Sequence, residues 1–161
     1  MTVPTPVELG DIVERFDHVS VGVRSIGTAE SLVALLGGSF RDGGDSIVGR
    51  FRWAQFDLPG PSKLELIEPL DPDDQDNFLV RFLATNGEGI HHVTLKVTDI
   101  EDAIQRAIEL GMTVVGVNLS NAAWKEAFIH PRAANGVLVQ LAEWTDGPPS
   151  GRTLTDVVGA S

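Results

Sequence analysis

The chain has 161 residues, of which 42% are hydrophobic, so it holds enough apolar material for one compact domain or two small halves that share a core. Its 12 Lys and Arg stand against 23 Asp and Glu, and the formal charge of −11 excludes nucleic acid and anionic membrane surfaces as main partners, because like charges repel. Cysteine is absent, which excludes disulfides, thiolate metal sites and a cysteine nucleophile.

The chain begins with MTVPTPVELG, which lacks the basic segment and apolar core of a secretory signal. No apolar run approaches the length that crosses a bilayer, and we therefore expect a cytoplasmic protein with no membrane partner. Residues 1–12 and 146–161 are rich in Pro, Gly, Ser and Thr, and this composition predicts an N-terminal arm and a C-terminal tail.

Residues 13–70 form a first predicted module. The stretch HVSVGV alternates as a strand does, and the helix after it carries apolar residues at helical spacing, namely Ala29, Leu32, Val33 and Leu36. Gly37 stands where a left-handed helix terminus is expected. The segments RFRWAQFDL and KLELIEP are typical of strands, and a Pro- and Gly-rich turn separates them.

A linker, residues 71–89, follows the first module. Its acidic start predicts a turn, and its middle predicts a short helix whose buried side carries Phe78, Leu79, Phe82 and Leu83. A Gly-rich exit then leads into the second half of the chain.

Residues 90–145 repeat the first module. HVTLKVTDIEDAIQRAIELG aligns without a gap to HVSVGVRSIGTAESLVALLG, and Gly111 falls at the position of Gly37. KEAFIHP and VLVQLAE are typical of strands, and Asn135-Gly136 between them predicts a tight hairpin turn. The repetition predicts an α+β fold in which one folding unit is built twice.

Strand parity predicts which side chains share a face of the sheet. The apolar residues pack beneath the helices, and the other face then presents four polar residues at matching positions of the two modules: His18, Glu65, His92 and Gln140. Two imidazole nitrogens, one carboxylate oxygen and one amide oxygen suit an open site for a divalent ion such as Mn, Fe(II), Co or Ni, with Zn less diagnostic. The alternative is that the four residues are ordinary polar side chains on a solvent-exposed face of the sheet. Their occurrence at matching positions of both modules favours the metal site.

Four other residues are secondary candidates. Glu68 and Glu143 lie close to the predicted ligands in sequence, but strand parity turns them toward the helices. His91 and His130 have no duplicated counterpart, and we expect structural or pocket-edge histidines at both positions.

Four stretches of the chain resemble a known superfamily. They are FDHVSVGV, SKLELIEPL, FLATNGEGIHHVTLKVTDIEDAI and AFIHPRAANGVLVQLAE, and together they span most of residues 16–143. They resemble the vicinal oxygen chelate (glyoxalase/bleomycin resistance) superfamily, and within it methylmalonyl-CoA epimerase. The resemblance implies two tandem βαβββ modules that form a curved mixed sheet, a cup around a divalent ion. Carried over by position, the family's metal ligands fall on His18, Glu65, His92 and Gln140.

The resemblance also implies a reaction and an assembly. A metal that chelates the substrate through two oxygens stabilises an enediolate, so the proton next to a carbonyl becomes acidic enough for a carboxylate to remove. The implied cofactor is a divalent ion, Co, Mn, Ni, Fe(II) or Zn. Such modules often pair between chains, so a homodimer is expected.

The sequence departs from the epimerase pattern at the catalytic carboxylates. The family usually carries Glu where Gln140 stands, and a glutamine does not accept a proton at neutral pH. A second base Glu is expected before the later strands of the first module, where this chain has only Asp42 and Asp45. Glu65 is therefore the predicted catalytic base, with Asp45 or His130 as alternatives, and one-base chemistry favours isomerisation, elimination or retro-aldol cleavage over racemisation.

The expected substrate is a small carbonyl acid or its CoA thioester. CoA phosphates require cations at the rim of the cup, and the predicted pocket residues there are Lys125, His130 and Arg132. Ordinary surface charge is the alternative role for the two cations.

Two other functions stay open. A non-catalytic, ligand-sequestering protein of the resistance type has the same fold, and Trp53, Trp124 and Phe128 are the candidate residues for lining its pocket. An extradiol-type dioxygenase uses two His and one carboxylate on iron, but in this chain the Glu lies in the first module instead of the last.

Overall fold

The computed structural model describes residues 7–159, so the first six residues of the predicted N-terminal arm lie outside the described residues. The chain divides into two compact units. The first-module unit takes His18–His91 and the segment after Asp146, and the second-module unit takes the chain up to Asp17 together with His92–Asp146. Each unit therefore combines one repeat with a segment from the far end of the chain.

The first-module unit is built on the order strand, helix, three strands. Its repeat comprises β1 (Val13–Gly22), which begins in the other unit, then η1 (Ile26–Thr28), α1 (Glu30–Leu35), β2 (Ser39–Ser46), β3 (Phe51–Asp57) and β4 (Lys63–Pro69). Strand β4 pairs in parallel with β1 and antiparallel with β3, and β3 pairs antiparallel with β2. Hydrophobic alternation determines which face is buried, and the core consists of Val23, Ile26, Ala54, Phe56, Leu64 and Leu66.

The predicted linker helix is α2 (Phe78–Asn86). It begins at Asn77, whose side chain accepts a hydrogen bond from the backbone N–H of Leu79, and this capping satisfies one of the free amides at the helix start. Leu79 and Leu83 pack with Ile67 of β4 in a second small core. The helix therefore covers the end of β4 within the first-module unit.

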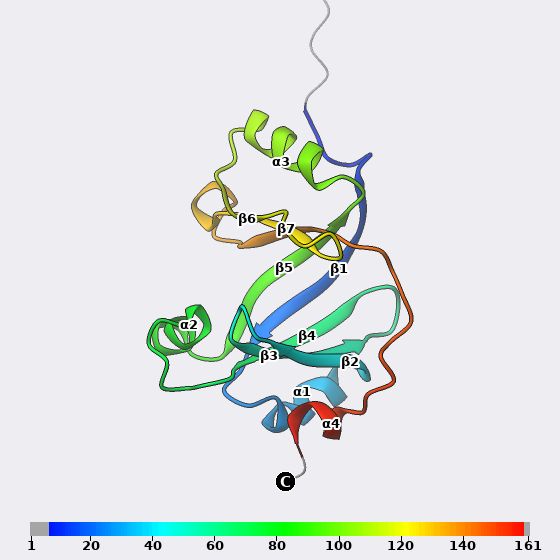
Figure 1. Cartoon of the computed structure of the whole chain (residues 1–161), viewed down its shortest axis with the longest axis vertical. Coiled ribbons are helices and arrows are strands. Elements are labelled where there is room, and N and C mark those ends of the chain that lie inside the picture. The colour runs from blue at the N-terminus through cyan, green and yellow to red at the C-terminus, as the bar shows by residue number, and fades with distance from the viewer. Residues whose placement is uncertain (1–6, 160–161) are drawn as a thin grey trace, which may run out of the picture. The chain divides into compact units, whose positions relative to one another are not determined.

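The second-module unit repeats the same order. Its repeat comprises β5 (Gly89–Val97), α3 (Ile100–Glu109), β6 (Val114–Asn118), β7 (Lys125–Ile129), η2 (Pro131–Ala133) and β8 (Val139–Glu143). Strand β8 pairs in parallel with β5 and antiparallel with β7, and β7 pairs antiparallel with β6. In Figure 1, α3 lies against β6 and β7.

Helix α3 shows how the sequence specifies this packing. The Asp99 side chain accepts a hydrogen bond from the backbone N–H of Asp102, and acidic residues in the first turn favour the positive end of the helix dipole. The apolar face buries Ile100, Ala103 and Ala107 against β7 and β8. Full burial of one Ile side chain contributes about 1.5–3 kcal/mol, so this face holds the helix on the sheet.

The hydrogen-bonded strand order is β2-β3-β4-β1-β5-β8-β7-β6. Both repeats show the order βαβββ, and the predicted α+β fold of two tandem modules is confirmed. Gly37 and Gly111 have φ angles of 69° and 80°, which confirms the left-handed termini that the sequence predicted. None of the helices described here is long and apolar enough to span a bilayer.

The structure departs from the residue patterns in two places. Strands β2 and β6 carry no clear strand signal of their own, because β2 contains Gly43 and Gly44 and β6 contains Gly116. Asn135 and Gly136 do adopt left-handed φ angles of 54° and 88°, but η2 lies between β7 and their turn. The connection is therefore longer than the predicted tight hairpin.

The segment after Asp146, predicted as a C-terminal tail, contains α4 (Leu154–Val158). A capping box at Thr153 starts this helix. Val157 is 6% exposed, and the backbone N–H and hydroxyl of Ser150 both donate to the Asp42 carboxylate in β2. Figure 1 shows α4 in red close to β2, so the end of the chain completes the core of the first-module unit.

Candidate functional site

The first-module unit contains a buried imidazole next to a carboxylate. His18 on β1 is 1% exposed, and its Nε2 lies 3.6 Å from Oε1 of Glu65 on β4. Two neutral donors hold that carboxylate: the Ser20 hydroxyl donates to Oε1 and the Gln55 amide to Oε2, each at 2.9 Å. Register explains the contacts, because Ser20 on β1 and Gln55 on β3 are the direct neighbours of Glu65 across the sheet.

His91 lies in the same unit and has an apolar environment. Its ring makes edge contacts with Phe78 and Phe82, with centroids 5.3 and 4.8 Å away. Burial lowers the pKa of His91 to about 4, although the nearby Glu65 carboxylate acts in the opposite direction. His91 is therefore neutral at pH 7.

The second-module unit contains the matching pair, His92 on β5 and Gln140 on β8. His92 is 8% exposed, and its ring lies edge-on to Phe128 with centroids 6.0 Å apart. Gln140 is 6% exposed and is held at both ends of its amide. Its Oε1 accepts from the Thr94 hydroxyl at 2.7 Å, and its Nε2 donates to Oε2 of Glu126 at 2.6 Å.

The two pairs occupy equivalent places in their own sheets. Ser20 pairs with Glu65 between β1 and β4, and Thr94 pairs with Gln140 between β5 and β8. In both units the residue two positions after the histidine, Ser20 or Thr94, carries a hydroxyl. This hydroxyl donates to the side-chain oxygen of Glu65 in the first-module unit and of Gln140 in the second. Each module therefore presents one imidazole and one oriented oxygen donor on the same kind of strand pair.

The donor chemistry of the first-module pair fits a divalent ion. Metal–ligand bonds of about 2.0–2.2 Å bring neighbouring donor atoms to about 3–4 Å from each other. The separation of 3.6 Å between His18 and Glu65 falls within this range. Nitrogen and hard oxygen donors suit the first-row divalent metals.

Glu68 and Glu143 make equivalent structural contacts in the two modules. Glu68 accepts from the backbone N–H of Ile26 at 2.6 Å, and Glu143 accepts from that of Ile100 at 2.9 Å. Arg52 donates to the other oxygen of Glu68, and Lys125 does the same for Glu143. Both carboxylates thus tie the last strand of a module to the start of its first helix, on the face that parity predicted.

The predicted pocket residues of the second module have local partners. Lys125 forms an ion pair with Glu143 at 3.1 Å. His130 accepts a hydrogen bond from the backbone N–H of Arg132 through Nδ1, which caps η2, and Arg132 itself is exposed. Asp45, the predicted alternative base, binds Arg52 at 2.8 Å, and Asp42 in the same segment binds Ser150.

Burial raises the pKa of Asp42, but the hydrogen bonds from Ser150 and Gly43 outweigh this effect and the net pKa is lowered. Asp42 is therefore ionised throughout the physiological range. It holds the C-terminal segment on β2.

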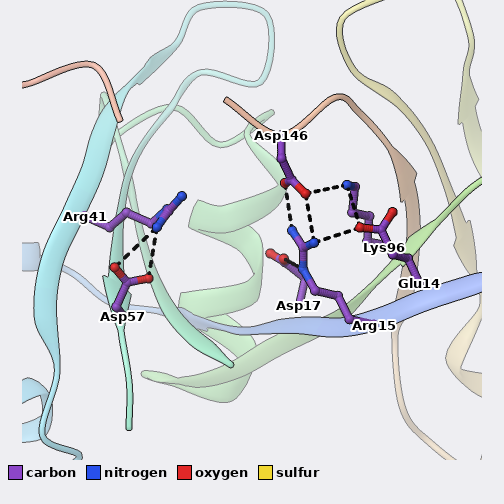
Figure 2. Close-up of polar contacts among 7 residues, drawn as sticks. All are labelled: Glu14, Arg15, Asp17, Arg41, Asp57, Lys96 and Asp146. Atoms are coloured by element: carbon purple, nitrogen blue, oxygen red, sulfur yellow. Dashed lines mark hydrogen bonds and ion pairs between the residues drawn. The ribbon is translucent and has the colours of Figure 1, made fainter. Parts of the chain in front are cut away.

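An ion-pair network lies at the edge of the second-module unit, and Figure 2 shows it around Asp146. Asp146 accepts from Arg15 at 2.9 Å and from Lys96 at 2.8 Å, and Arg15 also donates to Asp17. Hydrogen bonds from Arg15 and then Lys96 lower the pKa of Asp146. Figure 2 also shows the separate Arg41–Asp57 pair of the first-module unit, at 3.3 Å.

Sequence reasoning missed two residues that shape the candidate donors. Gln55 and Glu126 lie on the third strand of each module and reach the donor residue of the fourth strand. Parity of β3 and β7 was the available signal, since both residues point to the face opposite the helices. The register that brings them into contact is a tertiary property.

The chain matches known proteins in sequence and in structure. Residues 17–128 match the family model described as the Glyoxalase/Bleomycin resistance protein/Dioxygenase superfamily. The chain is 33% identical over 132 residues to the uncharacterized protein YqjC of Bacillus subtilis, which covers 80% of this chain and 91% of that protein.

Two named relatives are epimerases. The mitochondrial methylmalonyl-CoA epimerase of Dictyostelium discoideum is 33% identical over 85 residues, 51% of this chain and 49% of that protein. The crystal structure of methylmalonyl-CoA epimerase from Mycobacterium tuberculosis is similar with a TM-score of 0.72 and 26% identity, over 91% of this chain and 94% of that one.

Proposed function

Because the chain belongs to the glyoxalase/bleomycin resistance protein/dioxygenase superfamily, we propose that it is a metal-dependent enzyme of the vicinal oxygen chelate type. In this proposal it is an epimerase, isomerase or lyase that acts on a small carbonyl acid or an acyl-CoA thioester. The similarity to two methylmalonyl-CoA epimerases supports this choice of substrate class.

The observation that carries the proposal is the pair formed by the buried His18 and the partly buried Glu65. Their side chains are 1% and 12% exposed, and two hydrogen bonds from neutral donors orient the carboxylate. Removing a carboxylate and an imidazole from water costs free energy unless they form compensating polar interactions with each other or with a common partner. A bound cation is a partner that repays this cost.

In the proposal one divalent ion, Co, Mn, Ni, Fe(II) or Zn, binds the predicted set of four donors. His18, Glu65 and His92 are the candidate imidazole and carboxylate ligands, and Gln140 adds an amide oxygen. When bound, such an ion supplies Lewis-acid chemistry, which polarises a carbonyl oxygen and acidifies the neighbouring C–H bond.

Glu65 is the proposed catalytic base. Ser20 and Gln55 donate to its two oxygens, and these bonds fix the orientation of the carboxylate. Gln140 has no proton-accepting capacity at neutral pH, so the second module contributes no base at that position. A single base favours isomerisation or elimination over racemisation, in which protons leave and return on opposite faces.

Location and assembly are part of the same proposal. The proposed enzyme acts in the cytoplasm, the location expected from the sequence, as a homodimer, the assembly that the resemblance implies. The formal charge of −11 means that an anionic thioester needs local cations, and Lys125 and Arg132 remain the proposed candidates, with His130 beside them.

A second candidate function has one specific observation in its favour. Trp124 and Trp144 stack with ring centroids 4.8 Å apart on the second-module unit. Arg15 and Lys96 also lie over the Trp144 ring, and such an aromatic cluster with cations suits a planar ligand of a non-catalytic sequestering protein. The metal content of the protein separates the two functions.

The test is metal analysis of the protein as isolated, together with the His92→Ala variant. We expect one transition-metal ion per wild-type chain, its loss in the variant, and a lower melting temperature after chelation. His130→Ala is the matched control and should keep its metal, because His130 is not one of the four proposed donors and its Nδ1 caps η2. A wild-type protein without metal, whose stability a chelator leaves unchanged, favours the sequestering function instead.

A further inference from the structure

We infer that Glu126 is a positioning residue for Gln140: it turns the amide so that Oε1 is the atom presented to a divalent ion, and it places a negative charge directly behind that neutral ligand. The inference rests on the proposed function, because it assigns Gln140 to the donor set. It concerns side chains of the second-module unit alone.

Strand register brings the two side chains together. Strands β7 and β8 are antiparallel, with Phe128 opposite Gln140 and Glu126 opposite Ala142. Residues two apart on a strand share a face, so Glu126 and Phe128 lie on the face of Gln140. The intervening Ala127 is fully buried beneath α3, on the opposite face.

The hydrogen bonds determine how the amide is turned. The carboxylate of Glu126 only accepts, so it selects the Nε2 end of Gln140, at 2.6 Å. The Thr94 hydroxyl at the other end either donates or accepts, and alone it does not distinguish the two orientations. If the amide were flipped, its Oε1, which only accepts, would face the carboxylate, which also only accepts. Glu126 therefore fixes Oε1 at the end of the amide that points away from the carboxylate.

The carboxylate is itself anchored. The indole Nε1–H of Trp124 donates to the same Oε2 of Glu126 at 3.0 Å. The indole bond fixes the position of the carboxylate, and the bond that Gln140 donates to this anion polarises the amide and shifts electron density toward Oε1. A neutral amide thereby gains part of the ligand strength of a carboxylate.

The first-module unit shows the same pair with the roles exchanged. There the carboxylate of Glu65 lies beside His18, and the Gln55 amide stands behind it, donating at 2.9 Å. In the second-module unit the amide of Gln140 takes the position of Glu65, and the carboxylate of Glu126 stands behind. Each module thus holds one carboxylate–amide pair, which explains how Gln is accommodated at position 140.

The first test measures Co(II) binding to the metal-free protein by calorimetry. Glu126→Gln keeps the size of the side chain but removes its charge and its preference for a donor, and we expect about 10–100-fold weaker binding. Glu143→Gln is the matched control: the same change on the opposite face of β8, which should leave Co(II) affinity unchanged. Melting curves and circular dichroism establish that both variants are folded.

The second test exchanges the two side chains. The double variant Glu126→Gln/Gln140→Glu restores a carboxylate–amide pair with the charge on the ligand, and its Co(II) affinity should return to the wild-type value or exceed it. A purely structural role for Glu126 predicts no such recovery. Equal Co(II) affinity of wild type and Glu126→Gln overturns the inference alone, whereas a wild-type protein that binds no Co(II) overturns the proposed function and the inference with it.

Discussion

The carboxylate of Glu143, at the end of β8, accepts a 2.9 Å hydrogen bond from the backbone N–H of Ile100, the first residue of α3. Glu68 makes the equivalent bond to Ile26 in the other module. In both cases a basic residue of the preceding strand, Lys125 or Arg52, binds the second carboxylate oxygen. Both repeats therefore contain the same connection between the last strand and the start of the first helix, three positions after the proposed metal ligands Glu65 and Gln140.

We predict that Glu143→Ala lowers the free energy of unfolding by about 1–2 kcal/mol, because a helix-start amide loses its acceptor and Lys125 loses its partner. Urea denaturation measures the change. Glu109→Ala is the control, since Glu109 is exposed at the other end of α3, and its effect should stay within about 0.5 kcal/mol. Equal effects of the two substitutions would mean that the Ile100 contact contributes nothing.

Gly43→Ala should destabilise the protein by about 1–3 kcal/mol. An added Cβ would lie 2.7 Å from the backbone oxygen of Trp53 and 3.0 Å from Val157, and neither the strand nor the packed α4 helix yields easily. Gly147→Ala is the matched control, since its Cβ meets nothing within 4 Å, and it should be neutral or more stable by up to about 1 kcal/mol. Thermal and urea denaturation of both variants test the docking of the C-terminal segment on β2.

The Asp146 network predicts a loss of stability in acid. Hydrogen bonds from Arg15 and Lys96 hold the folded-state pKa of Asp146 below its ordinary value of 3.8, so in acid the unfolded chain binds more protons than the folded one. The contribution is fully present above that ordinary value and decreases as the pH falls below it. Asp146→Asn should therefore lower the urea midpoint at pH 7 and make the decline from about pH 5 to pH 2 shallower.

The Arg41–Asp57 pair is the control for this experiment. Asp57 accepts from one cation, Arg41, at 3.3 Å, and both side chains are substantially exposed, at 32% and 47%, so water and salt screen the attraction. Asp146 is 51% exposed, but it accepts from two cations at 2.9 and 2.8 Å, and one of them, Lys96, is only 6% exposed. Asp57→Asn should therefore change the urea midpoint at pH 7 by less than Asp146→Asn does. If Asp146→Asn behaves in the same way, the network does not stabilise the folded state.

Asn135 supplies a test of backbone conformation. Its φ angle of 54° lies in the left-handed region, where residues with a Cβ other than Asn and Asp are strained. Asn135→Ala should cost about 1 kcal/mol, whereas Asn135→Gly should be nearly neutral. Comparison of the two melting temperatures checks the prediction, and an alanine variant as stable as the wild type would contradict it.

The sequence alone predicted the repeated architecture and the faces of the strands. Alternation in β1, β4, β5 and β8 turned Glu68 and Glu143 toward the helices, where the structure has them. The same parity selected His18, Glu65, His92 and Gln140 as candidate donors. The sequence predicts these properties because strand alternation depends only on neighbouring residues. The same alternation occurs in both modules, so each module supports the prediction for the other.

Only the tertiary structure determines which side chains form hydrogen bonds with those donor residues. The register of β3 on β4 brings Gln55 to Glu65, and the register of β7 on β8 brings Glu126 to Gln140. It also decided that the segment after Asp146 packs on β2, more than 100 positions earlier in the chain. Strand register and the packing of the C-terminal segment depend on contacts between residues far apart in sequence. A shift of one residue in register would turn every side chain of a strand to its other face. A local sequence pattern therefore does not determine either property.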